Sequence, residues 1–479
     1  MPGFNGLSQT RRMSNRELDV AIIGGGSGGY AAARTAAKAG LNTAVIEGGD
    51  EVGGLCILRG CMPTKTLLYA AEVMHLTRHA PTWGIQPGDA SFDFKKVMAR
   101  KNALIQSFAD YRVNQLTDHR FEFIRARAVF EDPHTLSLGT GDTLTARHVV
   151  IATGSVVSEP PLPSLREVGY ITSDDALRLT ELPKSLIVLG GGAVAVEFAQ
   201  FFVRFGVEVT LVQRGPHILK DADTDVAVAV ESAFRREGMT VYTGTTLREA
   251  WKEGDRKGVT FEHEGKEVRV DAEEILFALG RTPNTAGLQL DRAGVERKGQ
   301  RVVTNARMET SAPHIYAVGD CTGPHEIVHI AIQQGEIAAH NMAHPQKRKT
   351  IDYRLLTSVV FTEPQVGVVG LTEKQAATER RPVLVASALF NDHGKSLIMN
   401  VKEGFVKLLA DPVSGELLGG CCVGPVGGEL IHEIVVAMAT RMTAAELAAL
   451  PHYHPTLAEL WTEPAEELAE QVGALLARG

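Results

Sequence analysis

The most informative segment of the sequence is Asp19-Val20-Ala21-Ile22-Ile23, which runs directly into Gly24-Gly25-Gly26-Ser27-Gly28-Gly29. The apolar run predicts a buried strand, and the glycines allow a tight turn into an alanine-rich helix that ends near Gly40. A second apolar run, Thr43-Ala44-Val45-Ile46-Glu47, predicts the next strand. A helix that begins at such a turn directs free N–H groups toward a pyrophosphate. The stretch therefore predicts a strand–helix–strand unit that binds a dinucleotide.

The same unit occurs a second time along the chain. Ser185-Leu186-Ile187-Val188-Leu189 is followed by Gly190-Gly191-Gly192-Ala193-Val194-Ala195, a helix to about Phe205, and the strand Glu208-Val209-Thr210-Leu211-Val212. A lone glycine motif is weak, but each copy here follows a strand and opens a helix. Two such units predict two bound dinucleotides.

Length and composition bound the class of protein. The chain has 479 residues, 44% hydrophobic and 22% charged, which predicts a multidomain globular protein without a membrane span. A formal net charge of −8 without a basic stripe argues against nucleic acid as a partner. Five cysteines are too few for a secreted disulfide scaffold, so a reducing, cytoplasmic location is expected.

Two cysteines separated by four residues follow the first unit, in Gly53-Gly54-Leu55-Cys56-Ile57-Leu58-Arg59-Gly60-Cys61-Met62-Pro63-Thr64-Lys65. A helix that begins near Pro63 would direct its positive end at Cys61 and favour the thiolate. Residues i and i+5 of a regular helix differ in height by about 7.5 Å, whereas the Cα atoms of a disulfide lie about 4.4–6.8 Å apart. Cys56 is therefore expected on distorted or non-helical backbone. This spacing is unusual for zinc and no second pair follows, so no metal site is predicted.

Two nucleotide units with a C-x4-C-x-P-x-K segment resemble the pyridine nucleotide–disulfide oxidoreductases, the family of dihydrolipoamide dehydrogenase, glutathione reductase and mercuric reductase. The resemblance extends from about Leu18 to Glu467. It implies an enzyme that passes electrons from a reduced nicotinamide, through FAD, to a redox-active Cys56–Cys61 disulfide. In this family Cys61 would lie beside the flavin, and Cys56 would be the interchange thiol that meets the substrate.

The resemblance also implies the other site residues. For FAD they are Gly24, Gly26, Gly29, Glu47, Thr153, Gly154 and Asp320. For the nicotinamide nucleotide they are Gly190, Gly192, Ala195, Arg214, Lys220 and Gly280. Lys65 and Glu197 match a pair beside the flavin N5, where a cation favours the reduced anionic flavin and the carboxylate holds the cation in position.

Near the other end, Pro451-His452-Tyr453-His454-Pro455-Thr456-Leu457-Ala458-Glu459 matches the family segment H-P-T-x-x-E. The match implies that His454 is the acid–base group serving the interchange thiol and that Glu459 orients its imidazole. In the family this histidine comes from the partner subunit, so a homodimer is expected.

The fold class implied is α/β, with two Rossmann-like dinucleotide-binding domains and a C-terminal α+β dimerisation domain. The expected division is a flexible N-terminal tail over 1–17, an FAD-binding domain over 18–158, an NAD(P)H-binding domain over 159–280, a second part of the FAD-binding or central domain over 281–350, and the dimerisation domain over 351–479.

The sequence is compatible with more than one substrate. Phe361-Thr362-Glu363-Pro364-Gln365-Val366 is similar to mercuric reductase, but the chain ends Leu475-Leu476-Ala477-Arg478-Gly479, without the terminal cysteine pair of those enzymes. Cys421 and Cys422 are interpreted as inert core residues of a buried strand. Arg34 lies where glutathione reductase has an arginine near glutathione.

We expect a dihydrolipoamide dehydrogenase-like reductase of a small-molecule or protein disulfide, with mercuric reductase-like or glutathione reductase-like activity as alternatives. Leu55 and Leu58 replace the usual Thr and Asn of the family, which weakens assignment to any well-known member. A catalytically silent nucleotide-binding flavoprotein is the alternative of another class. The retained cysteine pair and His–Glu dyad argue against it.

NADPH is the expected donor, with NADH also possible. Glu47 follows Gly24 at the same offset at which Gln213 follows Gly190, so an amide replaces the ribose acid in the second unit. An acid at this position repels a 2′-phosphate, whereas arginine binds it with charge-assisted hydrogen bonds. Arg214 comes next and Lys220 follows in the same loop. This basic pair resembles that of NADPH-dependent glutathione reductases.

Overall fold

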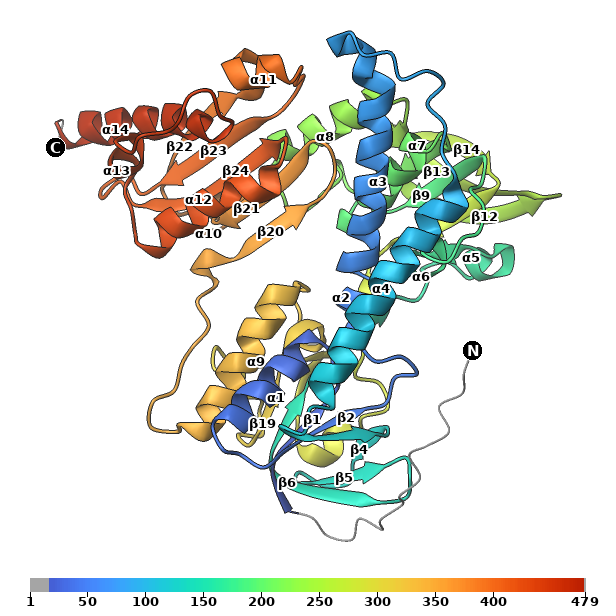
Figure 1. Cartoon of the computed structure of the whole chain (residues 1–479), viewed down its shortest axis with the longest axis vertical. Coiled ribbons are helices and arrows are strands. Elements are labelled where there is room, and N and C mark those ends of the chain that lie inside the picture. Colours follow the sequence, from blue (N-terminus) through green and yellow to red (C-terminus); the bar gives the residue numbers. More distant parts are fainter. Residues whose placement is uncertain (1–16, 478–479) are drawn as a thin grey trace. The chain divides into compact units, whose positions relative to one another are not determined.

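A computed structural model describes residues 17–477, drawn in Figure 1. The predicted flexible tail, 1–17, lies outside the described residues except for Glu17, which begins strand β1. The described residues form two compact units. The first contains the residues up to Met62, Asn102–Val157 and Arg281–Ile351, and the second contains Pro63–Lys101, Ser158–Gly280 and the residues from Asp352 onward.

A mainly parallel sheet forms the centre of the first unit, in the order β3-β2-β1-β6-β5-β4, with β19 also paired to β6. Its strands are β1 (Glu17–Ile23), β2 (Thr43–Glu47), β3 (Glu122–Arg125), β4 (Ala128–Phe130), β5 (Thr135–Leu138), β6 (Thr143–Ile151) and β19 (Ile315–Ala317). In register, Ile22 pairs with Val45 on one side and Val150 on the other. Val20 to Ile23 of this strand are buried on both faces, which explains their continuous apolar sequence.

Two helices of the first unit, α1 (Ser27–Lys38) and α9 (Val328–Ala343), pack against each other. Small residues permit this contact, since a Cβ added to Gly335 would lie 2.3 Å from the carbonyl oxygen of Gly28. The short strands β7 (Ser155–Val157) and β16 (Arg281–Pro283) form an antiparallel pair in the same unit, as do β17 (Arg297–Lys298) and β18 (Arg301–Val302). Helix α4 (Phe94–Leu116) supplies residues to both units.

The second unit contains the repeat of the βαβ motif, in a parallel sheet ordered β11-β10-β9-β15-β8. Its strands are β8 (Ile171–Thr172), β9 (Ser185–Leu189), β10 (Glu208–Val212), β11 (Thr240–Tyr242) and β15 (Glu274–Phe277), and its helices include α5 (Pro163–Val168), α6 (Ser173–Ala176), α7 (Ala193–Arg204) and α8 (Thr224–Arg236). A separate antiparallel sheet joins β12 (Thr246–Glu253), β13 (Arg256–His263) and β14 (Lys266–Ala272). Helix α3 (Cys61–His79) contributes Leu67, Leu68 and Ala71 to the same apolar core as α7.

The C-terminal part of the second unit is an antiparallel sheet, ordered β20-β21-β24-β23-β22. Its strands are β20 (Thr357–Val360), β21 (Gln365–Gly370), β22 (Leu384–Leu389), β23 (Phe405–Ala410) and β24 (Leu417–Gly424). Helices α12 (Gly427–Ala439) and α14 (Thr462–Leu476) pack on this sheet, α12 on β21 and β24 and α14 on β22 and β23 (Figure 1). The other helices are α10 (Glu373–Glu379), α11 (Gly394–Ile398) and α13 (Ala444–Ala448). The expected α+β arrangement is confirmed.

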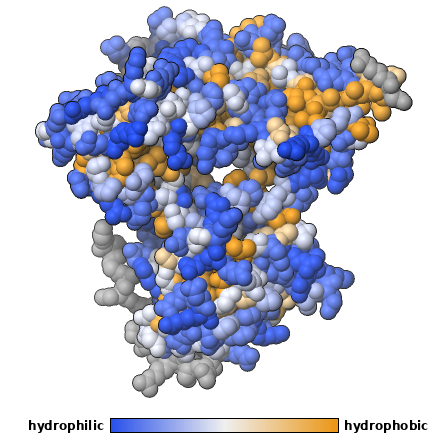
Figure 2. Space-filling model, turned by 180° about the vertical axis from the view of Figure 1, so that it is seen from behind, coloured by the Kyte–Doolittle hydropathy of each residue, from blue (hydrophilic) through white to orange (hydrophobic). Residues whose placement is uncertain are grey.

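Hydrophilic side chains cover most of the face drawn in Figure 2, interrupted by apolar patches. Among the described residues, no helix combines the length and apolar composition that crossing a membrane requires.

Candidate active site

The two cysteines lie on separate helices of the described chain. Cys56 belongs to the short helix α2 (Gly54–Leu58), and Cys61 is the first residue of α3. Cys56 is therefore helical, and between the two cysteines the helix breaks at Arg59 and Gly60. A Cβ at Gly60 would already lie 3.0 Å from the carbonyl oxygen of Leu55. Both side chains are thiols, and both are half-buried.

A hydrogen bond links the Cys56 thiol to Cys61. This bond, together with burial, raises the pKa of Cys56 above that of a free thiol, while the positive charge of Arg112 opposes the rise. Burial and this hydrogen bond therefore favour the protonated form of Cys56. Cys61 is the first residue of α3. That position suits a thiolate, because the first residue of a helix lies at the positive end of its dipole.

Arg112, on α4, is a site residue that the sequence did not indicate. Its guanidinium lies over the ring of Tyr30, 4.4 Å from the centroid, and its Nε donates to Gln115 at 3.1 Å. Its Nη1 is buried and has no hydrogen-bond partner. No carboxylate within residues 17–477 forms an ion pair with Arg112, whereas Arg34 is paired with Glu336. Arg112 is thus an uncompensated cation in the electrostatic environment of Cys56.

Lys65 and Glu197 are brought together as expected. The Lys65 Nζ lies 2.7 and 3.0 Å from the two carboxylate oxygens of Glu197, a side chain only 3% exposed. Phe361 completes the arrangement, because its backbone N–H donates to the same carboxylate at 3.0 Å and its ring lies 4.7 Å from the ammonium. The pair is therefore held in one geometry by three elements, α3, α7 and the end of β20.

The glycine turn of the first unit is shaped for close approach of a ligand. Gly24 has φ +107°, and a Cβ there would lie 2.4 Å from the carbonyl oxygen of Ala152. Gly26 is the N-cap of α1, with no capping side-chain hydrogen bond and no acidic residue in the first turn. Gly29 leaves no room for a Cβ, which would lie 1.9 Å from Gly24 O. The open helix end fits the pyrophosphate of FAD.

Other residues expected to bind FAD lie in the same unit. Glu47, at the end of β2, accepts hydrogen bonds from the N–H groups of Gly25 (2.9 Å) and Gly49 (2.7 Å). Thr153 has a buried hydroxyl without a partner, which is available to a ligand. Asp320 accepts from Ser155 at 2.7 Å. Gly154 follows Thr153 with φ +69°.

The second glycine turn repeats the first. Gly190 has φ +117° and its Cβ would lie 2.4 Å from Ala278 O, matching Gly24. Gly192 caps α7 with open space around it, and the helix again has neither a capping side chain nor an acidic first turn. Ala195 stands where the first unit has Gly29, and its methyl group is fully buried. Gly280, with φ +127°, follows β15. This donor set fits a second dinucleotide.

Gln213 and the loop after it face this turn. A Cβ added to Gly191 would lie 3.0 Å from the Gln213 side chain. Glu47 lies beside Gly25 in the same way in the first unit. The loop is tied back by a hydrogen bond from Leu219 N to Gly191 O (2.6 Å), so Lys220 follows a residue anchored to the turn. Arg214 and Lys220 are both exposed and available to a ligand.

His454 and Glu459 form the expected dyad. The Nδ1 of His454 lies 3.0 Å from Oε2 and 3.2 Å from Oε1 of Glu459. His454 is 77% exposed and Glu459 is 16% exposed. A third member, His393, was not predicted: its Nε2 lies 2.8 Å from Oε1 of the same carboxylate.

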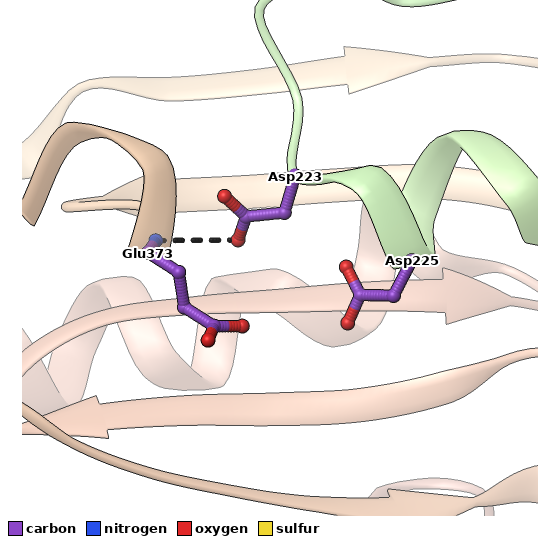
Figure 3. Close-up of side chains that lie close together, drawn as sticks. All are labelled: Asp223, Asp225 and Glu373. Atoms are coloured by element: carbon purple, nitrogen blue, oxygen red, sulfur yellow. Dashed lines mark hydrogen bonds between the residues drawn. The ribbon is translucent and has the colours of Figure 1, made fainter. Parts of the chain in front are cut away.

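Asp223, Asp225 and Glu373 are the group of carboxylates closest to a metal-ligand arrangement among the described residues (Figure 3). The buried Lys407 occupies this cluster, with its ammonium 2.9, 2.8 and 2.6 Å from the three carboxylates. Burial opposes the charge, but the nearby Cys421 and hydrogen bonds to the carboxylates raise the pKa of Lys407. An ammonium ion thus fills the place that a cation would take.

The remaining cysteines are buried. Burial raises the pKa of Cys321 and of Cys421 to about 12, and that of Cys422 well above the ordinary value. Cys421 and Cys422 are neighbours on β24 and belong to different apolar clusters, so they do not form a vicinal metal trap.

Comparison with known proteins defines the class. Residues 18–335 match the family model described as pyridine nucleotide-disulphide oxidoreductase, and residues 356–465 match the dimerisation domain of that family. The chain belongs to the pyridine nucleotide-disulphide oxidoreductase family, and it is an FAD-type disulfide oxidoreductase of that class. Membership implies FAD and a nicotinamide nucleotide as cofactors. The predicted family and fold class are confirmed.

Individual relatives and solved structures are more specific than the family models. The chain is 37% identical over 473 residues to dihydrolipoyl dehydrogenase from Thermus scotoductus, covering 97% of this chain and 100% of that protein. It is 36% identical over 454 residues to the enzyme of the same name from Mycobacterium leprae, covering 93% and 97%. Among solved structures, LpdA from Mycobacterium tuberculosis matches with a TM-score of 0.84 and 29% identity, covering 94% and 100%. The HOCl-induced flavoprotein disulfide reductase RclA from Escherichia coli matches with a TM-score of 0.82 and 27% identity, covering 94% and 99%.

Proposed function

We propose that this chain is an NADPH-dependent disulfide reductase of the dihydrolipoyl dehydrogenase type, active as a homodimer on a small-molecule or protein disulfide. The observation that carries the proposal is the contact between the two cysteines: the Cys56 thiol is hydrogen-bonded to Cys61, the first residue of α3. This proximity allows the two sulfurs to form and break a disulfide, as a pair that receives electrons and delivers them to a substrate must do.

Bound FAD would supply the transfer of two electrons between the nicotinamide and sulfur, and the residues of the chain position the groups and move the protons. Lys65, held by Glu197 and Phe361, would provide a fixed cation beside the flavin ring. Cys61 would carry the thiolate next to it, stabilised by the α3 dipole.

Cys56 would attack the substrate disulfide. Because it holds the proton in the reduced pair, it needs a base, and the His454 imidazole with its carboxylate partner fits that role. The proton accepted from Cys56 would then protonate the sulfur that leaves the substrate. The Cys61 thiolate would next attack Cys56 in the mixed disulfide, which restores the Cys56–Cys61 disulfide and releases the second product as a thiolate that takes a proton from solvent.

The homodimer rests on the match of residues 356–465 to a dimerisation domain and on apolar side chains that the single chain leaves exposed. In the C-terminal part these include Val413 (74%), Val436 (64%) and Tyr453 (83%). Side chains of this size favour burial against a partner. The partner subunit would bring its His454 to the Cys56 of the first.

Steady-state oxidation of NADPH and NADH by the purified protein tests the proposal, with lipoamide, oxidised glutathione, other disulfides and mercuric ion as acceptors. At least one disulfide should turn over, and Cys56→Ser should abolish that turnover while electron transfer to an artificial dye continues. Cys422→Ala is the matched control, since it removes a buried thiol elsewhere. Turnover of mercuric ion alone would establish the mercuric reductase alternative, and no oxidation with any acceptor would establish a silent flavoprotein.

A further inference from the structure

The carboxylate of Glu459 is shared by two imidazoles. Oε1 lies 2.8 Å from His393 Nε2, and Oε2 lies 3.0 Å from His454 Nδ1. The two rings differ in environment, because His393 is 8% exposed and His454 is 77% exposed. One ring is therefore part of the protein interior, and the other is presented to whatever approaches the site.

The hydrogen atoms in the contacts of Glu459 with His393 and His454 can be assigned from the chemistry of these groups. Partial burial opposes ionisation of Glu459, but hydrogen bonds from both histidines lower its pKa, so the group is a carboxylate and can only accept. The facing nitrogens, Nε2 of His393 and Nδ1 of His454, must then each carry a hydrogen. Nδ1 of His393 lies 3.1 Å from the hydroxyl of Ser396, a residue with no exposed surface, and it accepts that hydrogen.

These contacts leave Glu459 with little rotational freedom. A single hydrogen bond to an exposed histidine would allow the carboxylate to turn away, whereas the buried His393, itself anchored by Ser396, fixes Oε1. With Oε1 fixed, Oε2 faces His454, and only the ring with its hydrogen on Nδ1 can bond to it. The free lone pair of His454 is then on Nε2, the nitrogen that points away from Glu459.

We propose that His393 is a positioning residue: by fixing Glu459 it holds His454 in the Nδ1–H tautomer, so that Nε2 can exchange a proton with the interchange thiol. This inference rests on the proposed function of His454, and it adds a residue distant in sequence from the H-P-T-x-x-E segment. It involves no direct contact of His393 with substrate.

Other ionisable groups surround the site and provide controls. A cavity of about 510 Å³ lies against His393, His454 and Glu459, and its other charged or titratable lining residues are Asp392, His452, Glu463 and Glu466. His452 bonds a different carboxylate, that of Glu433, at 2.6 Å. His452→Gln therefore removes an imidazole from the same cavity without breaking the contacts of Glu459.

The test uses the full-length, FAD-loaded protein labelled with 15N-histidine, because the ring nitrogen shifts report the tautomer directly. The His454 signals are assigned from His454→Gln. We expect the Nδ1–H form in the wild type, and a mixture of tautomers in His393→Leu, which has similar volume but cannot donate. His393→Gln places an amide N–H near the position of Nε2 and should restore the wild-type signals. His452→Gln should leave them unchanged.

Kinetics give a second readout. His393→Leu should slow the disulfide half-reaction on the order of ten-fold, with the reduction of FAD by the nicotinamide unaffected and with recovery in His393→Gln. If His393→Leu does not fold, Ser396→Ala tests the same contact by removing the anchor of His393, and the same mixture of His454 tautomers is expected.

Wild-type His454 signals in the folded variant that lacks the donor, or a pure Nδ1–H form in every variant, would overturn the inference. Undiminished disulfide turnover by His454→Gln would instead contradict the proposed function. The nitrogen shifts would still decide the role of His393, so the two failures can be told apart.

Discussion

The positive charge of Arg112, which lies 56 positions further along the chain (112 − 56), opposes the rise in the pKa of the Cys56 thiol. Arg112 has no carboxylate partner among the described residues, so its charge is available to the sulfur. This residue escaped prediction because no motif connects α4 to the cysteine segment, and only folding brings them together. Cys56, Cys61 and the His454–Glu459 dyad could be predicted, since each pair belongs to one short sequence motif.

Arg112→Gln should make Cys56 less reactive. Removal of the positive charge raises the pKa of the thiol and lowers its thiolate fraction, so the reaction of the thiolate should slow by roughly several-fold. The measurement is the rate at which iodoacetamide alkylates Cys56 in the reduced protein near pH 8. Arg147→Gln is the control, because Arg147 is exposed and paired with Asp19. Equal rates in wild type and Arg112→Gln would remove Arg112 from the site.

Arg214 should decide between the two nicotinamide nucleotides. A charge-assisted hydrogen bond to a 2′-phosphate contributes about 1.5–3 kcal/mol, so Arg214→Ala should lower kcat/KM for NADPH by roughly ten- to a hundred-fold and leave NADH nearly unchanged. Arg248→Ala, an exposed arginine paired with Glu262, should affect neither donor. A wild-type preference for NADH would contradict the predicted pocket.

At the scale of elements, the two strand–turn–helix units could be predicted because their glycines are required by geometry. Gly24 and Gly190 have nearly the same positive φ. A Cβ added to either one would lie 2.4 Å from a backbone carbonyl oxygen, that of Ala152 or Ala278. The sheet of β12, β13 and β14 was not predicted, because β12 is mostly exposed and charged and lacks the apolar alternation of a half-buried strand, although the two-residue turn Gly254-Asp255 joins it to β13. His393 was not predicted either, because it lies 66 residues from Glu459 in sequence and no motif links the two.

Lys407 lies on strand β23 and forms ion pairs with carboxylates at the start of α8 and at the start of α10. Lys407→Met would leave buried negative charge without a counterion, and we expect a loss of about 3 kcal/mol in the free energy of unfolding. Two of the three carboxylates are half-exposed, which limits the loss. Urea denaturation measures it, and Lys402→Met, at an exposed site, should change stability by less than about 0.5 kcal/mol. A Lys407→Met protein as stable as wild type would show that the cluster contributes nothing.

At the scale of the whole molecule, the proposed site needs two subunits. Cys56→Ser and His454→Ala should each be nearly inactive toward a disulfide, for different reasons. If the site is shared, mixed dimers contain one complete site, and reassembly of equal amounts should recover roughly a quarter of wild-type activity, since half the dimers are mixed and each has one site of two. Recovery of no activity from verified mixed dimers would place both residues in the same subunit.

We propose that Cys56 and Cys61 are the pair that accepts electrons from the nicotinamide. The most direct measurement is alkylation of all accessible thiols under denaturing conditions, before and after anaerobic addition of NADPH, followed by mass spectrometry of the cysteine peptides. We predict that Cys56 and Cys61 are protected in the oxidised protein and labelled after reduction, while Cys321, Cys421 and Cys422 are labelled equally in both samples. Equal labelling of Cys56 and Cys61 with and without the nucleotide would contradict the account.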